Sequence, residues 1–167
     1  MSDWFFMLGE TLDAAEHDQV RACLAGLHLE GDFRIESVTD FQGARRIISH
    51  PDWDRRWWEA EQRERERLRS KASTDRESVE FLQSLSQSID QSISAAHGAA
   101  AVQAARVGCT DAGLIRAAAG ALGEALYLGK LAELAFETSS HPFLVKRALF
   151  VGGHWPLGLV AGCYYVF

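Results

Sequence analysis

Cysteine is scarce in this chain of 167 residues, and its three copies are widely separated. Cys23, Cys109 and Cys163 form no CxxC pair, and their number is odd. Both facts argue against a disulfide framework and against a zinc knuckle. A chain of this length also buries enough surface to fold without a disulfide or a metal. We therefore expect three small apolar side chains in a reducing, cytoplasmic compartment.

Motifs of catalytic and phosphate-binding sites are missing as well. The chain has no GxSxG, no HExxH and no Gly-rich loop that ends in Lys-Ser or Lys-Thr. Glu133, Glu137 and His141 recur at a spacing of four, but no second histidine stands near them. We therefore expect no metal and no cofactor. We interpret the segment 152–158 as a turn that leads into the last strands. The alternative is a recognition loop that presents His154 and Trp155.

Long hydrophobic runs suited to a leader or a membrane span are also lacking. The apolar stretch 4–8 is too short for the core of a signal peptide and follows no basic residue. Residues 148–167 contain no Asp, Glu, Lys or Arg over about the length of a membrane span. Glycines and a proline interrupt this stretch, which favours two strands, 157–160 and 163–167, around a tight turn. We expect no membrane contact.

Charge is unevenly distributed along the chain. The formal net charge is −6, but residues 1–40 carry nine carboxylates and two arginines, a net −7. Residues 41–76 are net +3, and residues 77–167 are net −2. The acidic segment disfavours nucleic acid, whose phosphates require a basic surface. It favours a basic protein partner through electrostatic steering.

Hydrophobic periodicity predicts a mainly α fold, in the α+β sense, with one helical domain over residues 1–167. Thr39 or Asp40 is the candidate N-cap of the second helix, Thr110 or Asp111 is that of the fifth, and Ser73 or Thr74 is that of the fourth. The expected helices cover residues 11–28, 40–48, 52–71, 74–107, 112–137 and 142–151, and strands are expected at 4–8, 32–38, 157–160 and 163–167.

Two of these helices have matching apolar faces. The stripes of 74–107 and 112–137 are rich in Ala and Gly, which allows close packing as a long antiparallel helix hairpin. The terminal strands, with 4–8 as a further candidate, are expected to form a small antiparallel sheet. The predicted architecture is a helical bundle joined to that sheet.

The helix at about 52–71 is rich in charge and carries an aromatic cluster at its start. Trp53 and Trp57 are four residues apart and share a face, whereas Trp58 points elsewhere. Trp and Arg dominate protein–protein hot spots, so these residues and Arg56 are candidates for an interface. The alternative is that Trp53 and Trp57 anchor the charged helix to the bundle.

Three residues are weak candidates for acid–base chemistry. Asp90 and His97 are seven residues apart and lie on the same edge of one helix, beside its apolar stripe. Glu133 falls near an apolar stripe, where burial would raise its pKa. The alternatives are a polar helix edge for the first two and a rim carboxylate paired with Lys or Arg for the third.

We interpret the chain as a non-enzymatic binding protein, of the type of a small acidic immunity protein that neutralises a basic nuclease toxin. That likeness is one of composition, and no residue motif carries it. The alternative is a small helical enzyme or ligand-binding domain with a pocket between helices 74–107 and 112–137, and a structural homo-oligomer is a third interpretation. The residues expected to bind the partner are Glu10, Asp13, Glu16, Asp18, Trp53, Arg56, Trp57 and Trp58.

Overall fold

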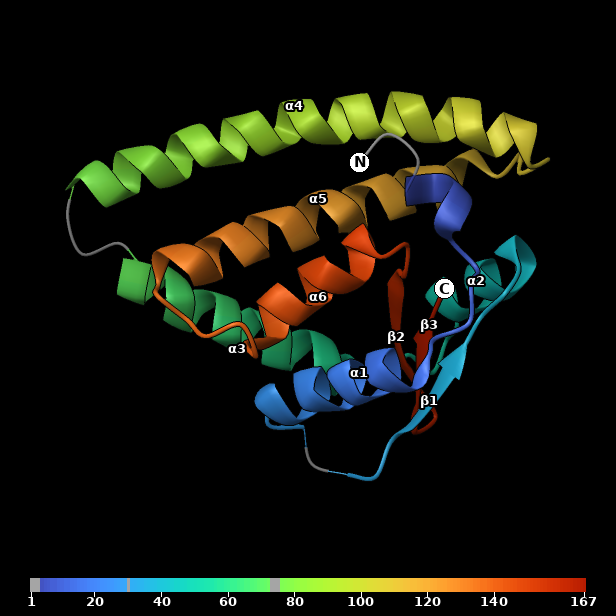
Figure 1. Ribbon diagram of the computed structural model, residues 1–167, viewed down its shortest axis with the longest axis horizontal. Coiled ribbons are helices and arrows are strands. Elements are labelled where there is room, and N and C mark those ends of the chain that lie inside the picture. Colours follow the sequence, from blue (N-terminus) through green and yellow to red (C-terminus); the bar gives the residue numbers. More distant parts are fainter. Residues whose placement is uncertain (1–3, 30, 73–75) are drawn as a thin grey trace.

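Most of the chain is helical, and a small sheet packs among the helices (Figure 1). The computed structural model describes residues 4–29, 31–72 and 76–167. The predicted fold class, mainly α with a small sheet, is confirmed. The elements in chain order are η1 (Trp4–Met7), α1 (Ala14–Gly26), β1 (Arg34–Ser37), α2 (Phe41–Ile48), α3 (Arg55–Ala72), α4 (Arg76–Arg106), α5 (Ala112–Leu134), α6 (Pro142–Val151), β2 (Pro156–Val160) and β3 (Cys163–Val166).

The sheet has three strands in the order β1–β3–β2. Strands β2 and β3 form the predicted antiparallel hairpin, with Val160 opposite Cys163. The turn residues Ala161 and Gly162 have φ values of 49° and 76°, as a two-residue turn of type I′ requires. Strand β1 pairs with β3 in parallel, so the sheet is mixed and not purely antiparallel as predicted.

The expected strand at 4–8 is wrong, because this segment forms the 3₁₀ helix η1. Trp4 and Phe5 enter the core, whereas the next two side chains are exposed. The outer edge of β2 is already covered: Trp53 forms a bridge with Val160, and the Asp54 N–H donates to the Leu159 carbonyl over 2.8 Å. A further strand therefore has no free edge there to join.

Helices α4 and α5 run side by side in opposite directions (Figure 1). Small residues allow their close approach: a Cβ on Gly123 would overlap the side chain of Ile93. Ala100 and Ala104 of α4 are fully buried against α5. The predicted caps Ser73 and Thr74 lie outside the described residues.

Aspartates begin three of the helices. The side chain of Asp13 accepts the Glu16 N–H, and the Glu16 side chain accepts the Asp13 N–H in return, which is a capping box. Asp40 accepts the N–H of Gly43 over 2.7 Å at the start of α2. Asp111 accepts the N–H of Leu114 over 2.9 Å at the start of α5. Of the two candidates for each cap, the aspartate and not the preceding threonine is therefore the N-cap of α2 and of α5.

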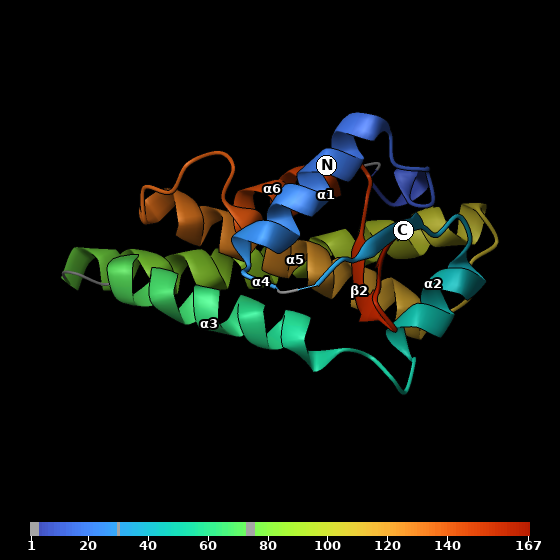
Figure 2. The ribbon, with the colours of Figure 1, turned by 90° about the horizontal axis from the view of Figure 1, so that it is seen from below.

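The core has two parts. One lies between α1, α3, α6, the sheet and the C-terminal half of α5; the other lies between η1, α2, α4 and the N-terminal half of α5. Helix α5 contributes to both and therefore forms the centre of the molecule (Figure 2). In the part of the chain that the structure describes, no helix is long and apolar enough to cross a membrane.

Candidate functional site

The four acidic residues predicted to bind a partner lie at and near the start of α1. Glu10 and Asp18 are exposed, and neither makes an ion pair among the described residues. Asp13 caps the helix. Glu16 completes the capping box and also contacts the buried His154, with its Oε1 2.9 Å from the imidazole Nε2. Two of the four carboxylates therefore stabilise the fold, and the other two are exposed at the surface.

Exposed apolar side chains occur in η1 and at the end of α6. Phe6 and Met7 of η1 are 39% and 36% exposed, and Val151 at the end of α6 is 57% exposed. Met7 lies against the turn that follows α6, because a Cβ on Gly153 would clash with the Met7 side chain. The exposure of Phe6 and Met7 was not predicted from the sequence, because a buried strand was expected at 4–8.

The predicted aromatic cluster is divided between core and surface. Trp57 is buried, with its ring edge-on to Tyr164. Trp53 is half-buried, and its ring lies so close to Gly158 that a Cβ at that position would overlap the indole. Trp58 alone is largely exposed, at 49%. The interpretation of Trp53 and Trp57 as anchors of the charged helix fits these positions.

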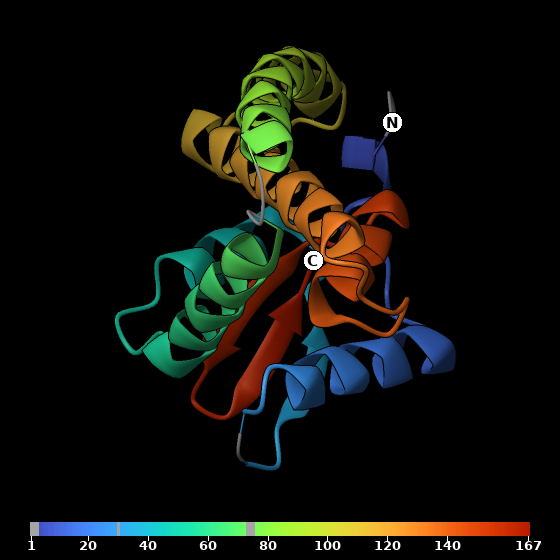
Figure 3. The ribbon, with the colours of Figure 1, turned by 90° about the vertical axis from the view of Figure 1, so that its left-hand side faces the viewer.

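The acidic and aromatic candidates do not form one surface. Arg56 is exposed and held by its neighbour Asp54, with a guanidinium–carboxylate distance of 2.7 Å. Arg56 and Trp58 lie on α3, which starts at Arg55 and not at the predicted Asp52, and Asp54 directly precedes the helix. Figure 3 shows α3 and α1 on opposite sides of the sheet.

A buried ion pair fixes α3 to α6. Lys146 Nζ lies 2.9 and 2.8 Å from the two carboxylate oxygens of Glu61, and both residues are about 5% exposed or less. Lys146 also lies 5.2 Å from the centre of the Trp57 ring. Burial alone would lower the pKa of Lys146, but the attraction of Glu61 and Glu124 outweighs burial and raises the pKa. The ammonium group is therefore charged, and its position makes it a structural cation.

A second set of polar contacts holds the other half of α3. Burial tends to raise the pKa of Glu64, but hydrogen bonds from Arg67 and His141 lower the pKa further than burial raises it. His141 Nε2 lies 2.7 Å from Glu64, while Nδ1 accepts the N–H of Phe143, so the imidazole donates to the carboxylate from Nε2. This contact closes α6 against α3.

The candidate metal ligands face different partners. Glu137 binds Arg67 and Lys71, and His141 binds Glu64. Among the described residues, no group of three or more His, Cys, Asp or Glu side chains could hold a metal ion. Burial raises the pKa of the Cys23 thiol to about 12, so this cysteine is not a nucleophile at neutral pH.

Glu133 is a paired carboxylate at the surface. Its two oxygens lie 2.6 Å from Arg147 and 2.6 Å from Lys130. Hydrogen bonds from Arg147 and Lys130 lower its pKa, so the raised value that burial would give is not found. Glu133 therefore fits the alternative interpretation, a carboxylate at the rim that is paired with Lys and Arg.

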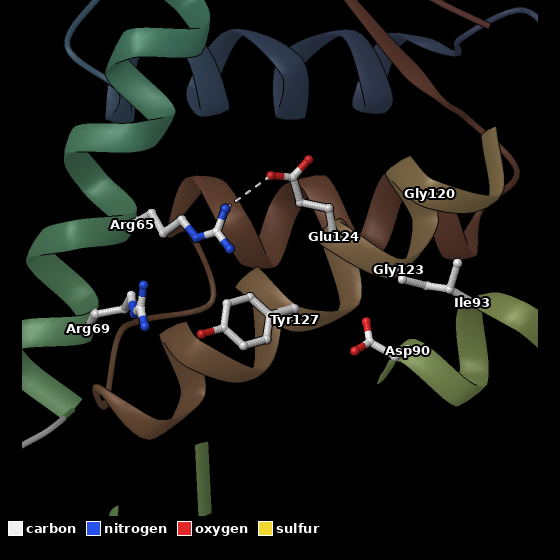
Figure 4. A pocket seen from close by; sticks show the side chains of 8 residues that line it. All are labelled: Arg65, Arg69, Asp90, Ile93, Gly120, Gly123, Glu124 and Tyr127. Atoms are coloured by element: carbon white, nitrogen blue, oxygen red, sulfur yellow. Dashed lines mark ion pairs between the residues drawn. The ribbon is translucent and has the colours of Figure 1, made fainter. Parts of the chain in front are cut away.

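A pocket of about 300 Å³ lies between α3, α4 and α5 (Figure 4). Of the three acid–base candidates, Asp90 alone belongs to its described lining, so Asp90, His97 and Glu133 do not form one site. Arg65 lies 3.5 Å from Glu124 and places its guanidinium 5.3 Å from the centre of the Tyr127 ring. The full described lining is Arg65, Arg69, Asp90, Ile93, Gly120, Gly123, Glu124 and Tyr127.

Comparisons of the chain with protein-family models, with curated proteins and with solved structures found no match. The function of the chain is therefore argued from the two surfaces described above, one at the start of α1 and one between α3, α4 and α5.

Proposed function

We propose that the chain is a non-enzymatic protein-binding module whose partner presents a basic surface. The docking surface, here called the N-terminal face, consists of Phe6, Met7, Glu10, Asp18 and Val151. The observations that carry the proposal are the exposure of Phe6, Met7 and Val151 and the absence of an ion-pair partner for Glu10 and Asp18 among the described residues.

The charge of this region supports the choice of a basic partner. Residues 4–20 contain four carboxylates and no Lys or Arg. Such a surface attracts a basic protein over a distance and repels an acidic one, which raises the association rate at low salt. The capping carboxylates Asp13 and Glu16 add to this field while they hold the helix.

The exposed apolar side chains would contribute the binding free energy that charge alone does not provide. Partner binding generally depends on a few apolar anchors near the centre of an interface, with charged residues around them. Phe6, Met7 and Val151 have the exposure that such a role needs, whereas Trp57 is already used in the core. The proposed anchors therefore differ from the tryptophans that the sequence suggested.

The specific form that we propose is an immunity-type protein that neutralises a basic nuclease toxin. A tight complex of that kind needs charge complementarity for specificity and a small apolar centre for a slow dissociation rate. Both elements are available on the N-terminal face.

The proposal is tested with charge-reversal variants that leave the caps intact. A basic protein captured by the wild-type chain would be purified, and its Kd measured at several salt concentrations. We expect Glu10→Lys with Asp18→Lys to weaken binding by roughly tenfold or more at low salt and to reduce the salt dependence. Met7→Ser should weaken binding mainly through faster dissociation.

The matched control reverses two exposed carboxylates of α3, Glu59→Lys with Glu66→Lys, which change the net charge equally on another face. Equal losses in the test and control pairs would contradict the proposed surface. Analytical ultracentrifugation of the chain alone tests self-association: a homodimer that Met7→Ser dissociates would replace the proposed partner with a second copy.

A further inference from the structure

The pocket between α3, α4 and α5 contains opposite charges that the packing of the helices does not use. Arg65 has Glu124 as its partner, but neither Arg69 nor the Asp90 carboxylate makes an ion pair among the described residues. Figure 4 shows Arg65 and Arg69 on one side of the pocket and Asp90 on the other, with the Tyr127 ring between them. One positive and one negative charge are thus left available on opposite walls.

Two glycines of α5, Gly120 and Gly123, line the pocket, and close packing requires only Gly123. A Cβ on Gly123 would overlap Ile93, so that glycine is required where α4 and α5 meet. A Cβ on Gly120 would have no heavy atom within 4 Å. Glycine inside a helix costs up to about 1 kcal/mol relative to alanine, and no close contact among the described residues requires a glycine at position 120. An open space at Gly120 is what a bound molecule would use.

We propose that this pocket binds a small zwitterion whose ammonium and carboxylate groups lie at opposite ends of a short, flat or apolar body. The carboxylate would meet Arg69 and the ammonium would meet Asp90, while the body would lie over Tyr127 and the backbone at Gly120. This site is separate from the N-terminal face, and the inference does not rest on the proposed function.

Size and charge both favour this class of ligand. A volume of about 300 Å³ is at the lower end for small-molecule sites and suits a molecule of few atoms. A pure anion would meet Asp90 and Glu124, and a pure cation would meet Arg65 and Arg69, so either would be opposed by like charge. A ligand with both charges satisfies both walls. ω-Amino acids and dipeptides share this chemistry.

The experiment compares three probes with the same ring and different charges. 4-(Aminomethyl)benzoate carries both charges, benzylamine carries the ammonium alone and 4-methylbenzoate carries the carboxylate alone. Binding to the full chain is followed by NMR titration of backbone amides. We expect 4-(aminomethyl)benzoate to bind at least about fivefold more tightly than either analogue, with shifts confined to residues around the pocket, because exposed charge contacts are individually weak. Equal binding of the three probes, or no binding of 4-(aminomethyl)benzoate, would overturn the proposal.

Two variants assign each charge to its wall. Arg69→Gln should weaken the zwitterion and 4-methylbenzoate by about fivefold and leave benzylamine unchanged. Asp90→Asn should weaken the zwitterion and benzylamine and leave 4-methylbenzoate unchanged. Both residues are exposed, so neither change should prevent folding. The same loss for all probes in both variants would contradict the assignment of the charges.

A matched pair of glycine variants tests the open space at Gly120. Gly120→Leu should abolish binding because the new side chain fills the pocket, whereas Gly98→Leu changes another helical glycine in open space and should leave binding unchanged. Binding that survives Gly120→Leu would overturn the placement. Once the probe binds, 5-aminopentanoate and glycylglycine distinguish the two sources: tighter binding of the first indicates a free ω-amino acid, and tighter binding of the second indicates a dipeptide.

Discussion

Replacement of Lys146 by methionine tests whether burial governs the strength of ion pairs in this protein. The Lys146 ammonium contacts both oxygens of Glu61, and both side chains are 6% exposed. Without the lysine, the Glu61 carboxylate would be buried without a counter-charge. Loss of one partner of a buried pair costs about 3–5 kcal/mol, so Lys146→Met should reduce the free energy of unfolding by that amount.

The control for this prediction is Lys130→Met. The Lys130–Glu133 distance is shorter, at 2.6 Å, but the side chains are 52% and 39% exposed. Exposed pairs contribute about 0–1 kcal/mol, and Glu133 keeps Arg147 as a partner in this variant. Distance alone would predict the larger loss for Lys130→Met, whereas burial predicts it for Lys146→Met.

The double variant Glu61→Leu with Lys146→Met removes both charges together. Apolar replacement of a complete buried pair is often neutral or stabilising, so we expect its unfolding free energy to lie within about 1 kcal/mol of the wild type. The assay is urea unfolding followed by circular dichroism and tryptophan fluorescence. A Lys146→Met variant as stable as Lys130→Met, or a double variant no more stable than Lys146→Met, would refute the reasoning.

Two further predictions concern helix packing and acid stability. Gly123→Ala should destabilise the protein by about 1–3 kcal/mol in urea unfolding, since its Cβ would overlap Ile93, whereas Gly98→Ala should stabilise it by up to about 1 kcal/mol. The pKa of Glu133 is lowered by hydrogen bonds from Arg147 and Lys130, and that of Glu137 by hydrogen bonds from Lys71 and Arg67. A lowered pKa in the folded state stabilises the fold above the ordinary value of 4.5 and ceases to do so as the pH falls through the lower folded value. Urea unfolding at pH 7, 5, 4 and 3 should therefore show falling stability below about pH 4.5, and Glu133→Gln with Glu137→Gln should flatten that fall; an unchanged profile in the double variant would contradict it.

Most helices and the terminal hairpin were predictable because their signals are local. Asp40 and Asp111 mark helix starts by hydrogen bonds that span three residues. The hairpin around Ala161 and Gly162 depends on two adjacent positive φ values. The parallel pairing of β1 with β3 joins residues more than a hundred positions apart, and no local pattern specifies it.

The course of η1 depends on the same kind of distant contact. A continuous apolar run is compatible with a buried strand or with a turn of helix. In the structure the segment is a 3₁₀ helix, and Trp4 and Phe5 pack into a core cluster with residues of α4 and α5. The exposure of Phe6 and Met7 follows from that choice, so the apolar part of the N-terminal face could not be predicted from the sequence.

The charged helix α3 shows why the candidate sites were only partly predicted. The buried residues of α3 recur at helical spacing and are Trp57, Ala60, Glu61, Leu68 and Ala72. One of them, Glu61, is a carboxylate that would be expected at the surface from the sequence. A sequence alone does not tell whether Glu61 meets water or Lys146, because its partner lies 85 residues further along the chain.

The buried contacts of α3 also determine what the helix presents to the pocket. Trp57, Glu61 and Leu68 face the core, and Arg65 and Arg69, which lie about 60° and about 100° further round the helix, line the pocket with residues of α4 and α5. Apolar contacts are non-directional, whereas the Lys146 ammonium has to stay within hydrogen-bonding distance of the Glu61 carboxylate, because separation would leave a buried charge without a partner. Buried polar groups can fix one arrangement at a cost in stability, and here the Glu61–Lys146 pair fixes the rotation that brings two guanidinium groups to the pocket.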